Sequence, residues 1–254
     1  MCGKCYYCRT GNYNECSERV GIGYGVNGAF TKYIVVRQGI VHSLPDNVDF
    51  KAGALSEPLA CTVHGITERV GISAGDLAVI VGPGPIGLLS AQVSKVEGAT
   101  VVVMGISKDK EKLKIAENLG ADRTVNVEEE DPMQVVKELS SGYGADVVLE
   151  CSGSQPGAQL CLKLVRKQGK YSQMGLFGKP IELDFEQIAY KELFVTGFFT
   201  QQWTSWERAL KLLELGKVQT KPLITEELPL TDWKKGFEEK EKAIAIKTLL
   251  YPVD

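Results

Sequence analysis

A glycine-rich turn constrains the fold of this chain more than any other feature. Apolar residues 78–81 lead into the motif GPGPIG at 82–87, after which apolar positions recur at helical intervals. This is the G-x-G-x-x-G pattern at a strand-to-helix turn, the context that dinucleotide binding requires. Gly82 permits the tight turn, Gly84 lets the backbone approach a pyrophosphate, and Gly87 lets helix and strand pack closely. Pro85 and Ile86 open the helix, whose free N–H groups face the phosphates.

Strand-like and helix-like patterns alternate from residue 77 onward. The strand candidates are residues 78–81, 100–104, 123–125, 146–150, 170–174 and 193–196, with helical patterns such as 110–119 and 132–140 between most of them. Six strands joined by crossovers of this length predict an α/β fold with a doubly wound parallel sheet, a Rossmann sheet, covered on both faces. Because the glycine turn follows the first strand, its context favours a dinucleotide site over an ordinary glycine turn.

Length and charge exclude several classes of function. The chain has 254 residues, enough for one large or two modest domains, and a formal net charge of -3. It therefore has no basic stripe of the kind that binds nucleic acid. No apolar run is long enough to span a membrane, and the N-terminus has no secretory signal pattern. We expect a cytoplasmic protein that binds neither nucleic acid nor membrane.

Four of the seven cysteines crowd into the first sixteen residues. Cys2, Cys5, Cys8 and Cys16 have the spacing C-x2-C-x2-C-x7-C. Four thiolates in one short lobe are the ligand set of a closed, tetrahedral structural zinc site, which holds a loop and has no open position for chemistry. The alternatives are reduced thiols that bind nothing and an iron–sulfur cluster. The crowding favours a metal in a reducing compartment over disulfides.

The segments that flank the α/β region have a different character. Residues 30–36 and 40–44 are β-like runs separated by turn signals, as in the tail of an all-β module. Glu57 opens an apolar helical stretch to residue 70, where an acid suits the helix dipole. An amphipathic helix at 203–215 precedes two short strands, 223–229 and 246–251, around a charged helix at 231–242. We expect these last pieces to complete the first β module.

Four segments together resemble the zinc-dependent medium-chain alcohol dehydrogenases, within them the sorbitol (polyol) and threonine dehydrogenase branch. They are GKCYYCRTGNYNEC, LSEPLACTVHGI, VIVGPGPIGLLSAQ and GADVVLECSG, and the similarity covers the whole chain in order. The resemblance implies a partial GroES-like β domain at 1–57 and 198–254 and a Rossmann domain at 58–197. It also implies NAD(P)-linked oxidation of a secondary alcohol or reduction of a ketone by a homodimer or homotetramer.

The resemblance implies a catalytic zinc, and here the chain departs from the family pattern. Family members carry a G-x-C-G stretch and a Gly-His-Glu stretch ahead of the cysteine lobe, whereas this sequence begins at the lobe. Its only histidines are His42, in a β-like run, and His64, whose helical position predicts packing. Glu57 resembles the acid at or beside the zinc, but one carboxylate does not hold the metal alone. We therefore expect a truncated dehydrogenase with impaired activity.

Two alternatives to an impaired dehydrogenase follow from the same absence. One is a non-catalytic nucleotide-binding remnant or pseudo-enzyme that keeps the cofactor half of the site. The other is a cleft repurposed for another reaction, such as ester hydrolysis. No G-x-S-x-G elbow supports hydrolysis, since the Gly-Tyr-Gly stretch at 142–144 lacks the serine.

In dinucleotide-binding folds, an acid about twenty residues past the G-x-G-x-x-G motif normally binds the adenosine ribose. The second predicted strand ends without this acid. Gly105 occupies that position, followed by Ser107 and Lys108. Glycine leaves room for a 2′-phosphate, and a hydroxyl and an ammonium group suit its binding. This favours NADP over NAD, although Lys108 also fits a solvated loop charge. Asp109 suits the start of the next helix.

The nicotinamide end of the cofactor is assigned by resemblance. Ligands of open α/β sheets bind beyond the carboxyl ends of the strands. By resemblance, Ser152, Gly175 and Leu176 face the nicotinamide ribose and ring. Cys151 lies at the same strand end, and we interpret it as a small buried apolar residue.

Overall fold

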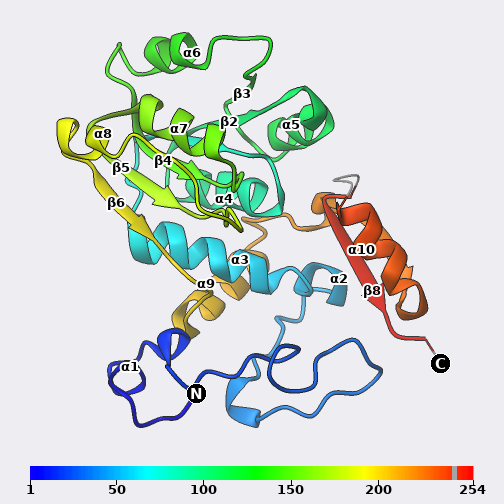
Figure 1. Cartoon of the computed structure of the whole chain (residues 1–254). Coiled ribbons are helices and arrows are strands. Elements are labelled where there is room, and N and C mark those ends of the chain that lie inside the picture. The colour runs from blue at the N-terminus through cyan, green and yellow to red at the C-terminus, as the bar shows by residue number, and fades with distance from the viewer. Residues whose placement is uncertain (242–244, 254) are drawn as a thin grey trace.

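The computed structural model describes residues 1–241 and 245–253. Its centre is a six-stranded sheet in the order β3-β2-β1-β4-β5-β6, with every neighbouring pair parallel (Figure 1). The strands are β1 Leu77–Val81, β2 Thr100–Gly105, β3 Arg123–Asn126, β4 Ala145–Glu150, β5 Val165–Gln173 and β6 Phe194–Gly197. This confirms the predicted doubly wound sheet, with β5 longer than predicted.

Alternating side chains on the strands supply two apolar cores, one on each face of the sheet. Ala78 and Ile80 of β1 pack with α4 (Pro85–Val96) and α5 (Lys110–Asn118). Leu77, Val79 and Val81 point the other way, toward α6 (Pro132–Leu139) and α7 (Gln155–Leu164). Both faces are therefore buried, as expected for a parallel sheet with helical crossovers.

The predicted helix after Glu57 forms in two parts. α3 (Ser56–Val63) continues as the π-helical segment η3 (His64–Val70), and α9 (Trp203–Glu214) packs against it beneath the sheet (Figure 1). His64 is buried, and its Nδ1 lies 2.7 Å from Oε2 of Glu68. Glu68 also accepts hydrogen bonds from the hydroxyls of Thr204 and Ser205 at 2.7 Å each. This network ties η3 to α9.

Glu68→Ala is expected to lower the free energy of unfolding by about 2–3 kcal/mol, because it leaves His64, Thr204 and Ser205 without their shared acceptor. Urea denaturation of this variant and of the exposed-loop control Glu129→Ala, expected to be near neutral, measures the difference. Burial raises the pKa of Glu68, but the hydrogen bonds from its three partners outweigh this and lower it. The stabilisation is thus present above the unfolded-state pKa and is lost as the pH falls through the lower folded-state value.

The predicted strands at 30–36 and 40–44 are wrong. Apart from a bridge between Ile22 and Val26, the described part of residues 1–57 forms only short helices: α1 Tyr6–Arg9, η1 Tyr13–Glu15, η2 Gln38–Ile40, α2 Phe50–Gly53 and the start of α3. Val35 is 100% exposed and Tyr33 is 82% exposed. A β-like run without a partner strand leaves its backbone groups unpaired, so the pattern alone does not make a strand.

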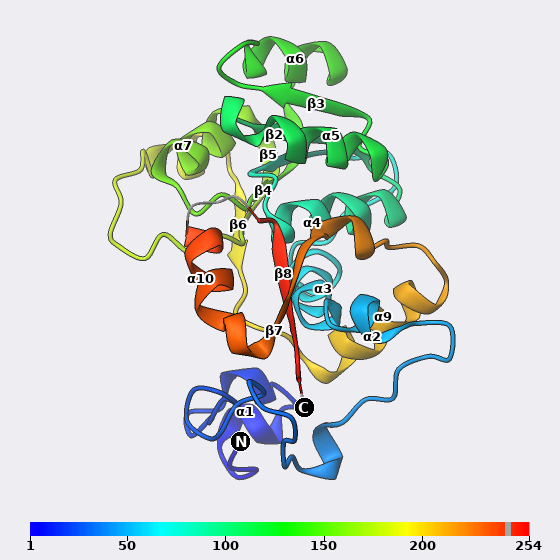
Figure 2. The same ribbon diagram turned by 90° about the vertical axis from the view of Figure 1, so that its right-hand side faces the viewer.

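The C-terminal segment forms a second, two-stranded sheet, and its Leu223 and Ile246 belong to the core that β1 and α4 share. β7 (Ile224–Pro229) and β8 (Lys247–Tyr251) pair in parallel with each other, and α10 (Trp233–Glu241) lies beside them (Figure 2). The predicted elements form, with residue 242 of the charged helix outside the described residues. Within the described residues no strand of 1–57 joins this pair, so the expected return to a β module is not seen. No described helix has the length and apolar character to cross a membrane.

Candidate functional site

The three glycines of the G-x-G-x-x-G motif differ in their surroundings. Gly82 has φ +104°, and a Cβ there would lie 2.7 Å from the Ser152 backbone. A Cβ on Gly87 would lie 1.9 Å from the Gly82 carbonyl oxygen. Gly84, the residue before α4, has ordinary dihedrals and open space where a Cβ would point. The first and third glycines are therefore required by packing, whereas the second leaves a free approach to the helix N-terminus.

A cleft of about 340 Å³ opens at the carboxyl ends of β1, β2 and β4. It brings together five residues singled out from the sequence: Gly82, Gly84, Gly105, Lys108 and Ser152. It lies at the topological switch point, because the chain leaves β1 for β2 on one side and returns through β4 on the other. Open α/β sheets bind nucleotides at this position. The donor groups and the vacant approach at Gly84 fit a dinucleotide pyrophosphate.

Two lysines and one acid line the β2 side of the cleft. Asp109 pairs with Lys112 at 2.8 Å, and it accepts a bond from the Ile106 N–H at 3.4 Å, so it caps the turn before α5 as the sequence indicates. Lys108 is exposed beside them. A Cβ on Gly105 would lie 3.0 Å from Pro83 and 3.1 Å from the Asp109 Cβ. A side chain at this position would therefore require Pro83 or Asp109 to move by a few tenths of an ångström.

Ser107 has two neighbours that the local sequence does not indicate. Its N–H donates to Glu128 at 2.9 Å, and its hydroxyl accepts from Asn126 at 3.1 Å. Hydrogen bonds from the Ser107 hydroxyl and N–H hold the pKa of Glu128 below its ordinary value. Asn126 ends β3 and Glu128 follows it, so the pairing of β3 with β2 brings both residues to Ser107.

The opposite wall is built by the loop after β4 and the first turns of α7, and the loop after β5 packs against the β4 loop. Gly175 packs against Gly153 of the first loop, and Leu176 beside it is exposed. Cys151 lines the cleft, and its Sγ lies 3.8 Å from the Met174 sulfur. Burial raises the pKa of Cys151, so its thiol stays protonated and is a poor nucleophile.

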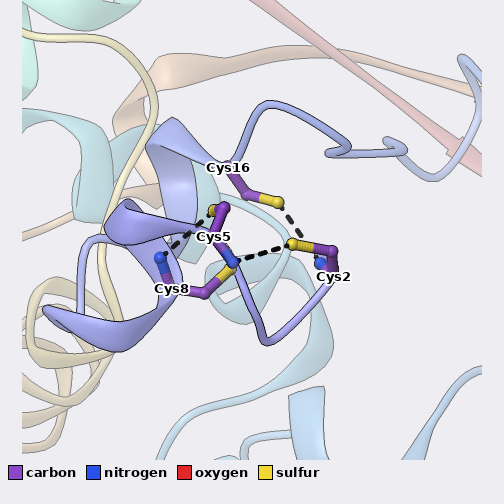
Figure 3. A group of neighbouring side chains, drawn as sticks. All are labelled: Cys2, Cys5, Cys8 and Cys16. Carbon is purple, nitrogen blue, oxygen red and sulfur yellow. Dashed lines mark hydrogen bonds between the residues drawn. The ribbon is translucent and has the colours of Figure 1, made fainter.

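The four N-terminal cysteines converge on one point (Figure 3). Their sulfur atoms all lie within 4.8 Å of one another. Backbone N–H groups point at three of the sulfurs, at 3.3 Å from Cys2 to Cys16, 3.3 Å from Cys5 to Cys2 and 3.5 Å from Cys8 to Cys5. Such hydrogen bonds stabilise thiolates, and four thiolates at this separation fit a tetrahedral Zn²⁺ ion.

The thiols of this lobe differ in acidity before any metal binds. The N–H of Cys8 lowers the pKa of Cys5 to about 6, and burial raises the pKa of Cys8 to about 11. The pKa of Cys16 is lowered by the N–H of Cys2. A metal ion requires the thiolate form of every ligand, so binding at this lobe releases protons.

Glu57 lies in the first turn of α3 without a ligand set around it. Its Oε1 accepts a bond from the Cys61 thiol at 3.4 Å, and the same sulfur lies 3.2 Å from Oε1 of Gln201. His42 packs against Trp203, with ring centroids 4.0 Å apart and the rings tilted by 37°, instead of joining Glu57. Within the described residues the cysteine lobe is the only group of three or more candidate metal ligands. The residues around Glu57 thus do not fit a catalytic zinc by themselves.

Comparisons with known proteins agree with this geometry. Residues 85–214 match the zinc-binding dehydrogenase family, and residues 1–46 match the GroES-like domain of alcohol dehydrogenases. Sorbitol dehydrogenase of Halalkalibacterium halodurans is 48% identical over 100% of this chain and 74% of its own length. D-arabitol-phosphate dehydrogenase of Enterococcus avium is 39% identical over 98% of this chain and 71% of its own length.

Solved structures give the same result. An oxidoreductase/dehydrogenase of unknown specificity from Escherichia coli aligns with a TM-score of 0.93 at 28% identity, over 100% of this chain and 73% of that one. A zinc-binding dehydrogenase from Sinorhizobium meliloti bound to NADP aligns with a TM-score of 0.84 at 30% identity, over 99% of this chain and 74% of that one. The chain belongs to the zinc-binding medium-chain dehydrogenase family. Its named relatives include polyol and threonine dehydrogenases.

Proposed function

We propose that this chain is an NAD(P)-dependent oxidoreductase of the polyol dehydrogenase type, transferring hydride between a secondary alcohol and nicotinamide. The observation that carries the proposal is the open backbone at Gly84, before the N-terminus of α4, in the cleft at the sheet's switch point. When bound, the nicotinamide ring accepts or gives the hydride. The protein's part is to hold the cofactor and orient the alcohol carbon against that ring.

Each group of cleft residues takes one part of the cofactor in this proposal. The turn of residues 82–87 holds the pyrophosphate through backbone N–H groups. Gly105, Ser107 and Lys108 bind the adenosine ribose and its 2′-phosphate. Ser152, Gly175 and Leu176 form the walls around the nicotinamide ribose and ring. We further infer that residues 58–197 act as the cofactor domain and that 1–57 and 198–254 act as the substrate side.

Lys108→Ala is expected to weaken NADPH binding about tenfold and to change NADH binding by less than about twofold. Lys112 is paired with Asp109, whereas among the described residues the Lys108 ammonium group forms no close ion pair and has only a longer-range attraction to Glu128. A 2′-phosphate would therefore interact strongly with this ammonium group. Fluorescence titration with each reduced cofactor measures the two affinities. Lys110→Ala, an exposed neighbour at the start of α5, should leave both affinities unchanged. Equal losses for both cofactors would assign Lys108 to the pyrophosphate instead.

The edge of β6 is proposed to pair with a second copy of the chain. Phe194 and Val195 are 53% and 43% exposed on this terminal strand, and an unpaired edge favours association. Wild-type chain is expected to elute as a dimer or tetramer in light-scattering chromatography. Val195→Lys is expected to shift it toward monomers, and a monomeric wild type would contradict the proposal.

The surroundings of Glu57 favour a second candidate, nucleotide binding without turnover by residues 1–254 alone. In the part of the chain that the structure describes, the Glu57 carboxylate accepts a hydrogen bond only from Cys61, whose thiol also contacts Gln201, and these residues do not complete a metal site. The test supplies NADP⁺ and NAD⁺ separately with a panel of polyols and secondary alcohols, with and without added zinc. Cofactor reduction supports the oxidoreductase. A folded chain that binds NADPH but reduces neither cofactor with any alcohol of the panel supports the second candidate.

A further inference from the structure

A fully buried acid at the end of β4 has no part in the roles assigned above. Glu150 is 0% exposed, and its carboxylate is the acceptor in each of the four hydrogen bonds described next. Oε1 accepts from the N–H of Ser152 at 2.9 Å and from the Ser152 hydroxyl. Oε2 accepts from the N–H of Gly153 at 3.1 Å and from the amide of Gln173 at 2.8 Å. A buried carboxylate is costly, and several donated hydrogen bonds are needed to offset that cost.

These partners belong to two separate loops. Ser152 and Gly153 follow β4, whereas Gln173 ends β5 and donates a second bond to the Gly175 carbonyl at 2.8 Å. The backbone of Glu150 joins them as well, since its carbonyl accepts the Gly175 N–H at 2.8 Å. One residue therefore holds both loops against each other.

The backbone packs closely around the carboxylate at two glycines. A Cβ on Gly175 would lie 2.7 Å from Oε2, and a Cβ on Gly157 would lie 3.0 Å from Oε1. Glycine at both positions allows the loop after β5 and the first turn of α7 to close directly onto Glu150. The side chain of Glu150 is thus in close contact with both loops.

The strand order indicates which half of a bound dinucleotide would lie against these loops. The pyrophosphate lies at the β1 turn and the adenosine ribose at the end of β2, so the other half extends over β4 and β5. We propose that Glu150 is a positioning residue, which sets the two walls around the nicotinamide half of the cofactor without touching the reacting atoms. This inference rests on the cofactor binding proposed above.

Glutamine does not replace Glu150 in this role. Both carboxylate oxygens face N–H donors, so either orientation of a glutamine amide places its NH₂ group against at least one of them. The loops must then shift, while the β1 turn and the β2 wall keep their own hydrogen bonds. We therefore expect weaker binding of the nicotinamide half of the cofactor and unchanged binding of the adenosine half.

The test compares whole cofactor with half cofactor on Glu150→Gln. The probes are NADPH and adenosine 2′,5′-bisphosphate, whose dissociation constants are measured by fluorescence titration and calorimetry. NADPH affinity is expected to fall about tenfold or more, and the bisphosphate affinity to change by less than about twofold. Glu182→Gln, an exposed change of the same kind after β5, should alter neither. A structural defect would lower both affinities together and would overturn the proposal, as would unchanged NADPH binding.

Two milder variants cover the case in which Glu150→Gln does not fold. Ser152→Ala and Gln173→Leu each remove one link to the carboxylate, and each should weaken NADPH about threefold with the bisphosphate unaffected. Parallel losses of both ligands in these variants would refute the assignment. Wild-type chain that binds neither probe would instead refute the proposed cofactor binding itself, which separates the two failures.

Discussion

Gly84→Ala is expected to abolish measurable NADPH binding while leaving the chain folded, and Gly87→Ala is expected to destabilise the fold itself. A Cβ on Gly84 meets no protein atom and occupies the space through which a pyrophosphate reaches the N–H groups of α4. A Cβ on Gly87 would lie 1.9 Å from the Gly82 carbonyl oxygen, so β1 and α4 must separate. Overpacking of this kind costs about 3 kcal/mol.

Thermal unfolding and NADPH titration of the two variants separate these effects. The melting temperature of Gly84→Ala should stay near that of the wild type, and that of Gly87→Ala should fall by several degrees. Gly120→Ala provides a control, because no atom surrounds its Cβ but its φ is +95°; it should destabilise modestly without affecting the ligand. Full NADPH affinity in folded Gly84→Ala would show that the ligand does not approach this turn.

Cys16→Ser is expected to remove the zinc ion and to unfold the N-terminal lobe without unfolding the sheet. Four thiolates are needed to close the tetrahedral site, and a structural zinc contributes its binding free energy to folding. Wild-type chain should contain one zinc per chain by elemental analysis, and the variant almost none. Hydrogen exchange should show protection lost in residues 1–16 and kept in β1 and β4.

The identity of the metal and the pH dependence check the same assignment. Because every ligand is a thiolate, zinc should be released as the pH falls, with proton uptake by the lobe. Cys61→Ser, a cysteine outside the lobe, should keep its zinc. Bound iron with visible absorbance would favour the iron–sulfur alternative, and zinc retained by Cys16→Ser would exclude the four-cysteine site.

The sheet was predictable because its signals are local. β1, β2 and β4 are short apolar runs, each followed by a helical pattern. The GPGPIG turn has glycines at positions where a Cβ would collide or would fill the approach to the phosphates. The cysteine lobe was predictable for a similar reason, since its four ligands lie within sixteen residues.

The errors and omissions concern features that depend on partners distant in sequence. The run at 30–36 has β-like composition, but strand formation needs a neighbouring strand, which the described chain does not supply there. Glu150 and Glu128 have no local signature that distinguishes them from other acids. Their contacts to Gln173 and Ser107 follow from the β4–β5 and β2–β3 pairings, which only the folded sheet establishes.

Titration of the purified chain with NADPH and NADH, followed by nicotinamide fluorescence, tests the central claim most directly. The account predicts saturable binding of one cofactor per chain, tighter for NADPH, and competition by adenosine 2′,5′-bisphosphate. Absence of saturable binding of either cofactor to folded, zinc-loaded chain would contradict it.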